Sequence, residues 1–143
     1  MAPQVPARAL VVEDEIALGR VYVRALEAAG HLVDHAADGA AGLARMSEGN
    51  YDVVVSDVHM PRMGGIDLLA EIRRTWPDVP VIMTTAQRDA DTYARAREIG
   101  TVRYLIKPVP LEKLASAVDA AIKLRNLLVR TRQRRERSGA AGG

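Results

Sequence analysis

The sequence contains no cysteine and no phenylalanine, and aromatic residues make up only 3% of its 143 residues. Without cysteine, the chain can form no disulfide, no thiolate metal site and no cysteine nucleophile. The scarcity of aromatic rings argues against a base-stacking platform for single-stranded nucleic acid. No uncharged run approaches the length of a membrane-spanning helix, and the N-terminal stretch lacks the apolar core of a signal peptide. We therefore expect a soluble cytoplasmic protein that does not contact membranes.

The positive charge is concentrated near the C-terminus. Residues 111–137 contain eight Lys or Arg and three Asp or Glu, a balance of +5. The whole chain has 20 basic and 18 acidic residues, so 12 basic and 15 acidic residues, a balance of −3, remain for residues 1–110. The basic pI of 9.2 is therefore a property of the C-terminal segment. It does not indicate a nucleic-acid-binding surface over the whole domain.

Short apolar runs alternate with segments of helical periodicity five times along the chain. The length of the chain suits one domain. The expected strands are residues 9–12, 32–36, 53–57, 80–85 and 102–106. The expected helices are residues 16–29, about 39–48, 66–75, 89–99 and 111 to about 130 or beyond. This alternation predicts βαβ units, a parallel sheet and right-handed crossovers.

Residues that can carry chemistry follow four of the expected strands. Glu13 and Asp14 follow the first, Asp57 ends the third, Thr85 ends the fourth and Lys107 follows the fifth. In open α/β sheets, ligands bind beyond the carboxyl ends of the strands. Three carboxylates that meet there repel one another unless a cation joins them, and oxygen ligands of this kind suit Mg²⁺. With a lysine and a hydroxyl, the set matches phosphoryl transfer to an aspartate.

Five motifs in this order resemble the response-regulator receiver family. They are Leu-Val-Val-Glu-Asp-Glu at residues 10–15, Asp57, Met-Pro-Arg-Met-Gly-Gly at residues 60–65, Thr85 with Ala86, and Lys107 with Pro108. The resemblance covers roughly residues 7–123. It implies a flavodoxin-like, doubly wound five-stranded parallel sheet of order 2-1-3-4-5. It also implies phosphorylation by a histidine kinase or a phosphotransfer protein, and a phosphate-driven change of the surface formed by the fourth helix, fifth strand and fifth helix.

The resemblance assigns roles to residues at the acidic edge. Asp57 is the phosphoacceptor, and Mg²⁺ binds to Asp14, to Asp57 and to the backbone carbonyl of His59. Glu13 acts through a metal-bound water, at a place where the family often has Asp. Lys107 pairs with Asp57 and later with a phosphoryl oxygen. The side chain of His59 is expected to influence water access to the acyl phosphate.

Two residues match the switch pair of the family. Thr85 would move its hydroxyl onto the phosphoryl group, and Tyr104, three residues before Lys107, would follow it inward. Thr84 is the alternative to Thr85 if the strand register is off by one, and packing at a strand end is the alternative role for Tyr104. The Lys107–Pro108 peptide bond is expected to be cis.

Other classes of protein fit the sequence less well. A pseudo-receiver that serves only as an interaction or dimerisation module would be expected to lack Asp57, Asp14 or Lys107. An aspartate-nucleophile phosphatase would have a second acid where His59 stands, and a nucleotide-binding domain would have a glycine-rich phosphate loop. A helix-turn-helix has no room after residue 137, so we expect no direct nucleic-acid binding by this domain. The expected protein is a phosphoacceptor switch and not a turnover enzyme.

The last expected helix is longer than a receiver domain requires. The chain is expected to divide into a disordered start (residues 1–6), the receiver domain (7–123), a basic helical extension (124–137) and a flexible tail (138–143). Ala117, Ala121, Leu124 and Leu128 form a second apolar line, expected to be exposed, that either dimerises or continues as a signalling helix. A homodimer could also use the fourth helix, fifth strand and fifth helix. We interpret the arginines of residues 130–137 as a solvated face, with a nucleic-acid or acidic partner as the alternative.

Overall fold

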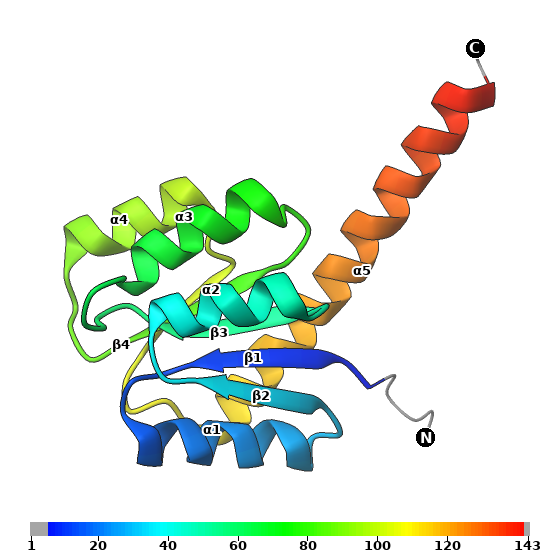
Figure 1. The fold of residues 1–143 in the computed structure, drawn as a ribbon. Coiled ribbons are helices and arrows are strands. Elements are labelled where there is room, and N and C mark those ends of the chain that lie inside the picture. The colour runs from blue at the N-terminus through cyan, green and yellow to red at the C-terminus, as the bar shows by residue number, and fades with distance from the viewer. Residues whose placement is uncertain (1–5, 142–143) are drawn as a thin grey trace.

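The computed structural model describes residues 6–141 (Figure 1). The strands are β1 (Arg8–Val12), β2 (Leu32–Ala36), β3 (Val53–Asp57), β4 (Val81–Thr85) and β5 (Arg103–Ile106). The helices are α1 (Ile16–Ala28), α2 (Gly39–Glu48), α3 (Gly65–Thr75), α4 (Ala90–Ile99) and α5 (Leu111–Ala141). All neighbouring strands are parallel, in the order β2-β1-β3-β4-β5. The predicted flavodoxin-like fold class and its strand order are confirmed.

Helices cover both faces of the sheet (Figure 1). α2, α3 and α4 bury one core against it, and α1 and α5 bury the other. Every residue of β3 is buried, and its side chains alternate between the two cores: Val54 joins the first, while Val53 and Val55 join the second. This double burial explains why β3 has a continuous apolar run instead of an alternating pattern. Because β3 is the central strand, its last residue, Asp57, lies in the middle of the sheet edge.

Local signals account for some of the helix ends. The Asp38 side chain accepts a hydrogen bond from the backbone N–H of Ala41 at 2.7 Å and so caps α2. α4 is followed by Gly100, whose φ of +124° is a conformation that favours glycine. The expected and observed ends of β1, α1, α3, β4, α4 and β5 differ by one residue, which is ordinary for helix and strand termini.

α5 is 31 residues long, and its C-terminal half projects beyond the sheet (Figure 1). It includes residues 138–141, for which the sequence predicts a flexible tail. Alanine favours helix, and a single glycine costs only about 1 kcal/mol. Residues 1–5 and 142–143, which the expected disordered start and flexible tail include, lie outside the described residues. Among residues 6–141, no helix is both long and apolar enough to cross a bilayer.

The expected exposed line along α5 is only half correct. Ala117 and Ala121 are buried against the sheet, at 5% and 3% exposure, because α5 still lies over the second core at this point. Leu124 and Leu128 lie further along the helix and are 37% and 38% exposed, and Leu127 beside them is 59% exposed. Among the side chains described in the projecting part of α5, the exposed large apolar ones are therefore Leu124, Leu127 and Leu128.

Candidate functional site

The carboxyl ends of three strands bring four charged side chains to one edge of the sheet. Asp57 ends β3, Glu13 and Asp14 follow the adjacent β1, and Lys107 follows β5. Carboxylate oxygens of Glu13, Asp14 and Asp57 lie within 4.8 Å of one another. Glu13 and Asp57 are buried, whereas Asp14 is exposed. The predicted convergence of three carboxylates is confirmed.

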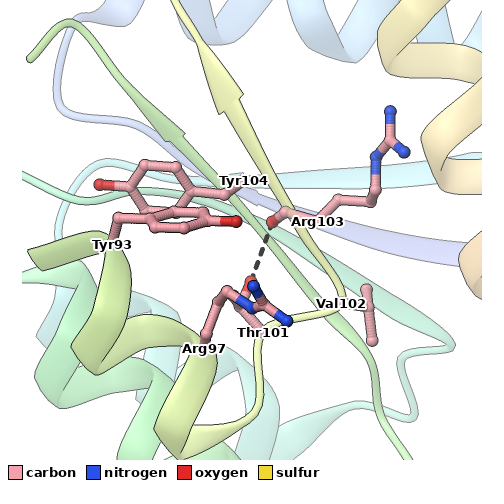
Figure 2. Close-up of a pocket in the computed structure, with 6 residues that line it drawn as sticks. All are labelled: Tyr93, Arg97, Thr101, Val102, Arg103 and Tyr104. Atoms are coloured by element: carbon pink, nitrogen blue, oxygen red, sulfur yellow. Dashed lines mark hydrogen bonds between the residues drawn. The ribbon is translucent and has the colours of Figure 1, made fainter. Parts of the chain in front are cut away.

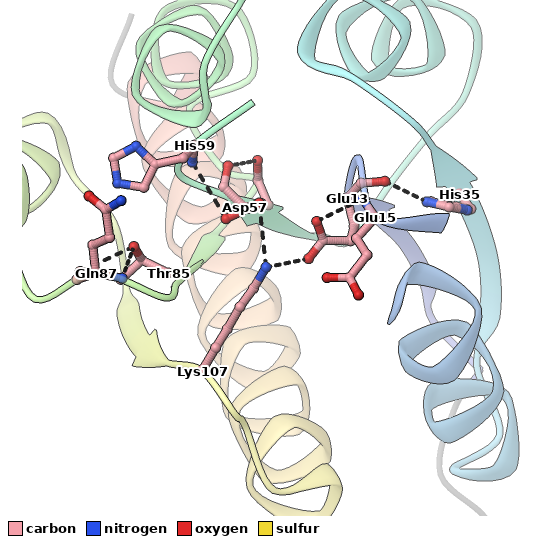
Figure 3. Close-up of polar contacts among 9 residues, drawn as sticks. Glu13, Glu15, His35, Asp57, His59, Thr85, Gln87 and Lys107 are labelled. Carbon is pink, nitrogen blue, oxygen red and sulfur yellow. Dashed lines mark hydrogen bonds and ion pairs between the residues drawn. The ribbon is translucent and has the colours of Figure 1, made fainter. Parts of the chain in front are cut away.

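The amine of Lys107 lies between two of these carboxylates (Figure 3). Its Nζ is 2.6 Å from Oε1 of Glu13 and 3.4 Å from Oδ2 of Asp57. The expected pairing with Asp57 is present, but the shorter contact is with Glu13. A glutamate side chain is one methylene longer than an aspartate, so its carboxylate can reach across the site to the amine. The Lys107–Pro108 peptide bond is cis, as predicted.

Burial and charge strongly affect proton binding at this site. Burial raises the pKa of Glu13 to about 7, against the hydrogen bond from Lys107, and the charge of Asp57 adds to the rise. Burial lowers the pKa of Lys107, but the hydrogen bond to Glu13 and the charges of Asp57 and Glu13 raise it above its ordinary value overall. The amine therefore stays charged near neutral pH. When all three carboxylates are ionised, the site with the ammonium carries two negative charges, which a divalent cation would neutralise.

The donor set fits Mg²⁺. All three side chains offer carboxylate oxygens, the hard ligands that Mg²⁺ prefers, and the exposed Asp14 leaves the site accessible to water. The backbone N–H of His59 is 3.4 Å from Oδ1 of Asp57, so the chain after β3 folds back over the carboxylate. The imidazole of His59 lies on the opposite side of Asp57 from Glu13 (Figure 3). The side chains of the three histidines take no part in the acidic cluster of the described residues.

Gly65 is a site residue that sequence reasoning missed. A Cβ at this position would lie 2.1 Å from the carbonyl oxygen of Asp57, so only glycine lets α3 begin this close to the end of β3. Its backbone N–H donates to the carbonyl oxygen of Val58 at 2.9 Å and holds the loop closed. The signal in the sequence was the Gly64–Gly65 pair directly before a helical pattern.

Thr85 and Tyr104 lie on the same face of the sheet. Tyr104 is paired with Met83 and packs against the first core, and Thr85 is two residues after Met83, so the alternation of strand side chains puts it on that face. Thr84 points to the opposite face, which favours Thr85 as the partner of Tyr104. The hydroxyl of Thr85 accepts from the backbone N–H of Gln87 at 3.1 Å and lies 3.2 Å from its carbonyl oxygen.

Tyr104 also lines a cavity on the surface formed by α4 and β5. Its ring contacts Tyr93 of α4 edge to face, with centroids 5.1 Å apart (Figure 2). Its hydroxyl is buried, and burial raises its pKa, while the nearby Thr85 hydroxyl opposes this rise. The cavity has a volume of about 410 Å³, and its lining residues are Tyr93, Arg97, Thr101, Val102, Arg103 and Tyr104.

The fold and the site together define a doubly wound α/β domain with an acidic, lysine-containing site at the carboxyl edge of its sheet. The family model of the response regulator receiver domain matches residues 9–119. The chain is 33% identical over 118 residues to the transcriptional regulatory protein QseB of Haemophilus influenzae, and 38% identical over 113 residues to the transcriptional regulatory protein TcrA of Mycobacterium tuberculosis. These matches cover 82% and 79% of this chain but 53% and 45% of the relatives, so the chain spans about half their length.

Solved structures agree with this assignment. A response regulator receiver domain from Clostridium thermocellum matches with a TM-score of 0.81 at 35% identity, over 85% of this chain and 98% of that one. NtrX from Brucella abortus matches with a TM-score of 0.85 at 26% identity, over 94% of this chain and 30% of that one. The chain belongs to the response regulator receiver domain family. These are the receiver domains of two-component signal transduction.

Proposed function

We propose that this domain accepts a phosphoryl group on Asp57 from a phosphohistidine of a histidine kinase or phosphotransfer protein, in a reaction that requires Mg²⁺. The observation that carries the proposal is the position of the Lys107 amine, 2.6 Å from Glu13 and 3.4 Å from Asp57, beside the cluster of three carboxylates. An ammonium and a carboxylate nucleophile at this distance are the two groups that a transferring phosphoryl group needs.

In the proposed reaction, a carboxylate oxygen of Asp57 attacks the phosphorus. A phosphorus–oxygen bond forms, the phosphorus–nitrogen bond breaks, and its electron pair goes to the ring nitrogen of the donor. The imidazole leaves neutral because its other ring nitrogen already carries a proton. Lys107 pairs with a phosphoryl oxygen through one of the three N–H donors of its amine. Asp14, Asp57 and the backbone carbonyl of His59 would hold Mg²⁺, and Glu13 would act through a water molecule. When bound, Mg²⁺ supplies positive charge against the phosphoryl oxygens.

The switch would pass from Asp57 to the α4-β5-α5 surface. The Thr85 hydroxyl hydrogen-bonds to the backbone of Gln87, two residues further on, and it can exchange this local partner for a phosphoryl oxygen. The Tyr104 hydroxyl lies close enough to the Thr85 hydroxyl for Thr85 to lower its pKa, against the larger rise from burial, so a shift of Thr85 alters the surroundings of Tyr104. The phosphoryl group is added to Asp57 of the protein itself and later removed from it. We therefore propose a switch and not a turnover enzyme.

An apolar hollow beside Lys107 supports a protein as the phosphodonor. It is a cavity of about 490 Å³ between α1 and the start of α5, and it is lined by Glu15, Leu18, Val21, Tyr22, Ala86, Lys107, Pro108, Val109 and Leu111. Val21 and Leu111 are 44% and 39% exposed, and Ile16 on the same helix as Val21 is 45% exposed. Exposed apolar side chains next to a reactive site suit the docking of a protein surface.

We further propose that Leu124, Leu127 and Leu128 of α5 pack against the same residues of a second copy. Three large apolar side chains on one helix face are costly to leave in water, at about 25 cal/mol per Å² of apolar surface. The cytoplasmic location expected from the sequence stays a prediction.

Labelling by a small phosphodonor tests the proposed function. Acetyl phosphate with Mg²⁺ should add one phosphoryl group to the wild type and none to Asp57→Asn, measured by intact mass spectrometry. Absence of labelling in the wild type, both with acetyl phosphate and with a phosphorylated kinase, would favour the alternative of a pseudo-receiver that acts as an interaction module. Equal labelling of both proteins would refute Asp57 as the acceptor.

A further inference from the structure

A histidine outside the acidic cluster holds the loop that carries two of its carboxylates. Nε2 of His35, near the end of β2, lies 2.9 Å from the backbone carbonyl oxygen of Glu13 (Figure 3). The backbone N–H of Glu13 donates to the carbonyl oxygen of Ala36 at 3.0 Å. Two consecutive residues of β2 therefore bind both sides of Glu13, one through its main chain and one through its imidazole.

Helix α1 leaves space for this imidazole at Gly19. A Cβ at Gly19 would lie 2.4 Å from Nε2 and 2.5 Å from Cε1 of His35, so no other amino acid fits while the ring stays in place. Gly19 is buried inside α1, where glycine favours the helix less than alanine does. The ring of His35 is a specific reason for glycine at this position.

The rest of the loop has few other constraints. Glu15, the N-cap residue of α1, makes no side-chain capping hydrogen bond. Its backbone N–H contacts Oε2 of Glu13 at 3.3 Å, a bond that uses the carboxylate of the site itself. The carbonyl oxygen of Glu13 and the nitrogen of Asp14 belong to one planar peptide unit. Release of that carbonyl would therefore allow the peptide to rotate and carry the Asp14 side chain with it.

We propose that His35 is a positioning residue, which orients the Glu13–Asp14 peptide and thereby sets the affinity of the acidic site for Mg²⁺. Gly19 is the part of α1 that admits its ring. The inference rests on the proposed Mg²⁺ site. It applies to Mg²⁺ binding by the unphosphorylated protein as well as to Mg²⁺ binding during phosphoryl transfer.

Calorimetric titration of the full chain with Mg²⁺, without a phosphodonor, tests this role. His35→Ala should weaken Mg²⁺ binding by about tenfold, as the loss of residues that orient metal ligands commonly does. His35→Gln, whose amide N–H can reach the same carbonyl, should restore most of the affinity. His31→Ala is the matched control, because His31 binds Asp119 at 3.2 Å, at the other end of β2, and its loss should leave the affinity unchanged. Unchanged affinity in His35→Ala would overturn the proposal alone, and no Mg²⁺ binding by the wild type would overturn the proposed function with it.

Thermal unfolding of the double variant tests the contact between ring and helix. Gly19→Ala alone should lower the midpoint of unfolding, because its Cβ displaces the imidazole, and should weaken Mg²⁺ binding as His35→Ala does. In the His35→Ala background, Gly19→Ala should raise the midpoint, since the obstacle is gone and alanine favours the helix. The same sign in both backgrounds would show that Gly19 does not serve the ring.

Discussion

Replacement of Glu13 by glutamine should stabilise the protein at alkaline pH and leave its stability at acid pH almost unchanged. Burial raises the pKa of Glu13 from 4.5 to about 7, although the hydrogen bond from Lys107 opposes this rise. At about 1.36 kcal/mol per pH unit, the difference between the folded and unfolded carboxyl corresponds to about 3 kcal/mol. Glutamine has the same shape and cannot ionise, so it avoids this cost.

The sign follows from proton binding in the two states. Below pH 4.5, Glu13 is protonated in both the folded and the unfolded protein, and its contribution to stability is fully present. As the pH rises to about 7, the unfolded chain has already lost the proton, while the folded chain must ionise a buried carboxyl. Stability is therefore lost over this window in the wild type and kept in Glu13→Gln.

Urea denaturation followed by the fluorescence of Trp76, the single tryptophan, measures this difference. The experiment is run with EDTA across the range from acid to alkaline pH, because bound Mg²⁺ would stabilise the ionised carboxylate. The free energies of unfolding of the two proteins should agree near pH 4.5 and differ by about 3 kcal/mol above pH 8, with the variant more stable. Glu15→Gln, at an exposed acid nearby, is the control and should follow the wild type at every pH. Parallel profiles of Glu13→Gln and wild type, or a less stable variant at pH 8, would refute the reasoning.

Three further substitutions test separate contacts. Gly65→Ala should lower the free energy of unfolding by about 1–3 kcal/mol and slow phosphorylation by acetyl phosphate, because the new Cβ meets the backbone of Asp57. An unchanged midpoint of urea unfolding would contradict the close approach. Tyr22→Phe should stabilise the protein by about 1 kcal/mol, since the hydroxyl of Tyr22 is buried without a partner among the described residues. A destabilised variant in the same assay would show that the hydroxyl has a hydrogen-bond partner. Arg125→Ala, which removes the 3.1 Å ion pair with Asp52, should cost less than about 1 kcal/mol, and the loss should shrink in high salt; a larger, salt-independent loss would indicate packing instead.

Much of the fold could be predicted from the sequence because the pattern of each element is local. The run Val53–Asp57 has the stiff, apolar side chains of a strand buried on both faces, and its final carboxylate marks the sheet edge. Parallel strands end at a common edge, so residues that follow different strands were expected to meet there. The convergence of Glu13, Asp14 and Asp57 follows from this rule together with strand order.

Only the tertiary structure decided which partner a charged side chain contacts and where α5 stops being buried. The choice of Lys107 between Asp57 and Glu13 depends on fractions of an ångström and on the length of the glutamate, which no spacing in the sequence encodes. The burial of Ala121 depends on where α5 leaves the sheet, and the helical pattern is the same on both sides of that point.

The sequence by itself thus determined the order of elements and the edge at which the charged residues gather, since hydrophobic periodicity and strand polarity act over short distances along the chain. It could not determine that the imidazole of His35 occupies the place of a side chain at Gly19, or that Gly65 meets the backbone of Asp57. These contacts join residues of different elements, and only the packing of α1 and α3 onto the sheet brings them within van der Waals distance.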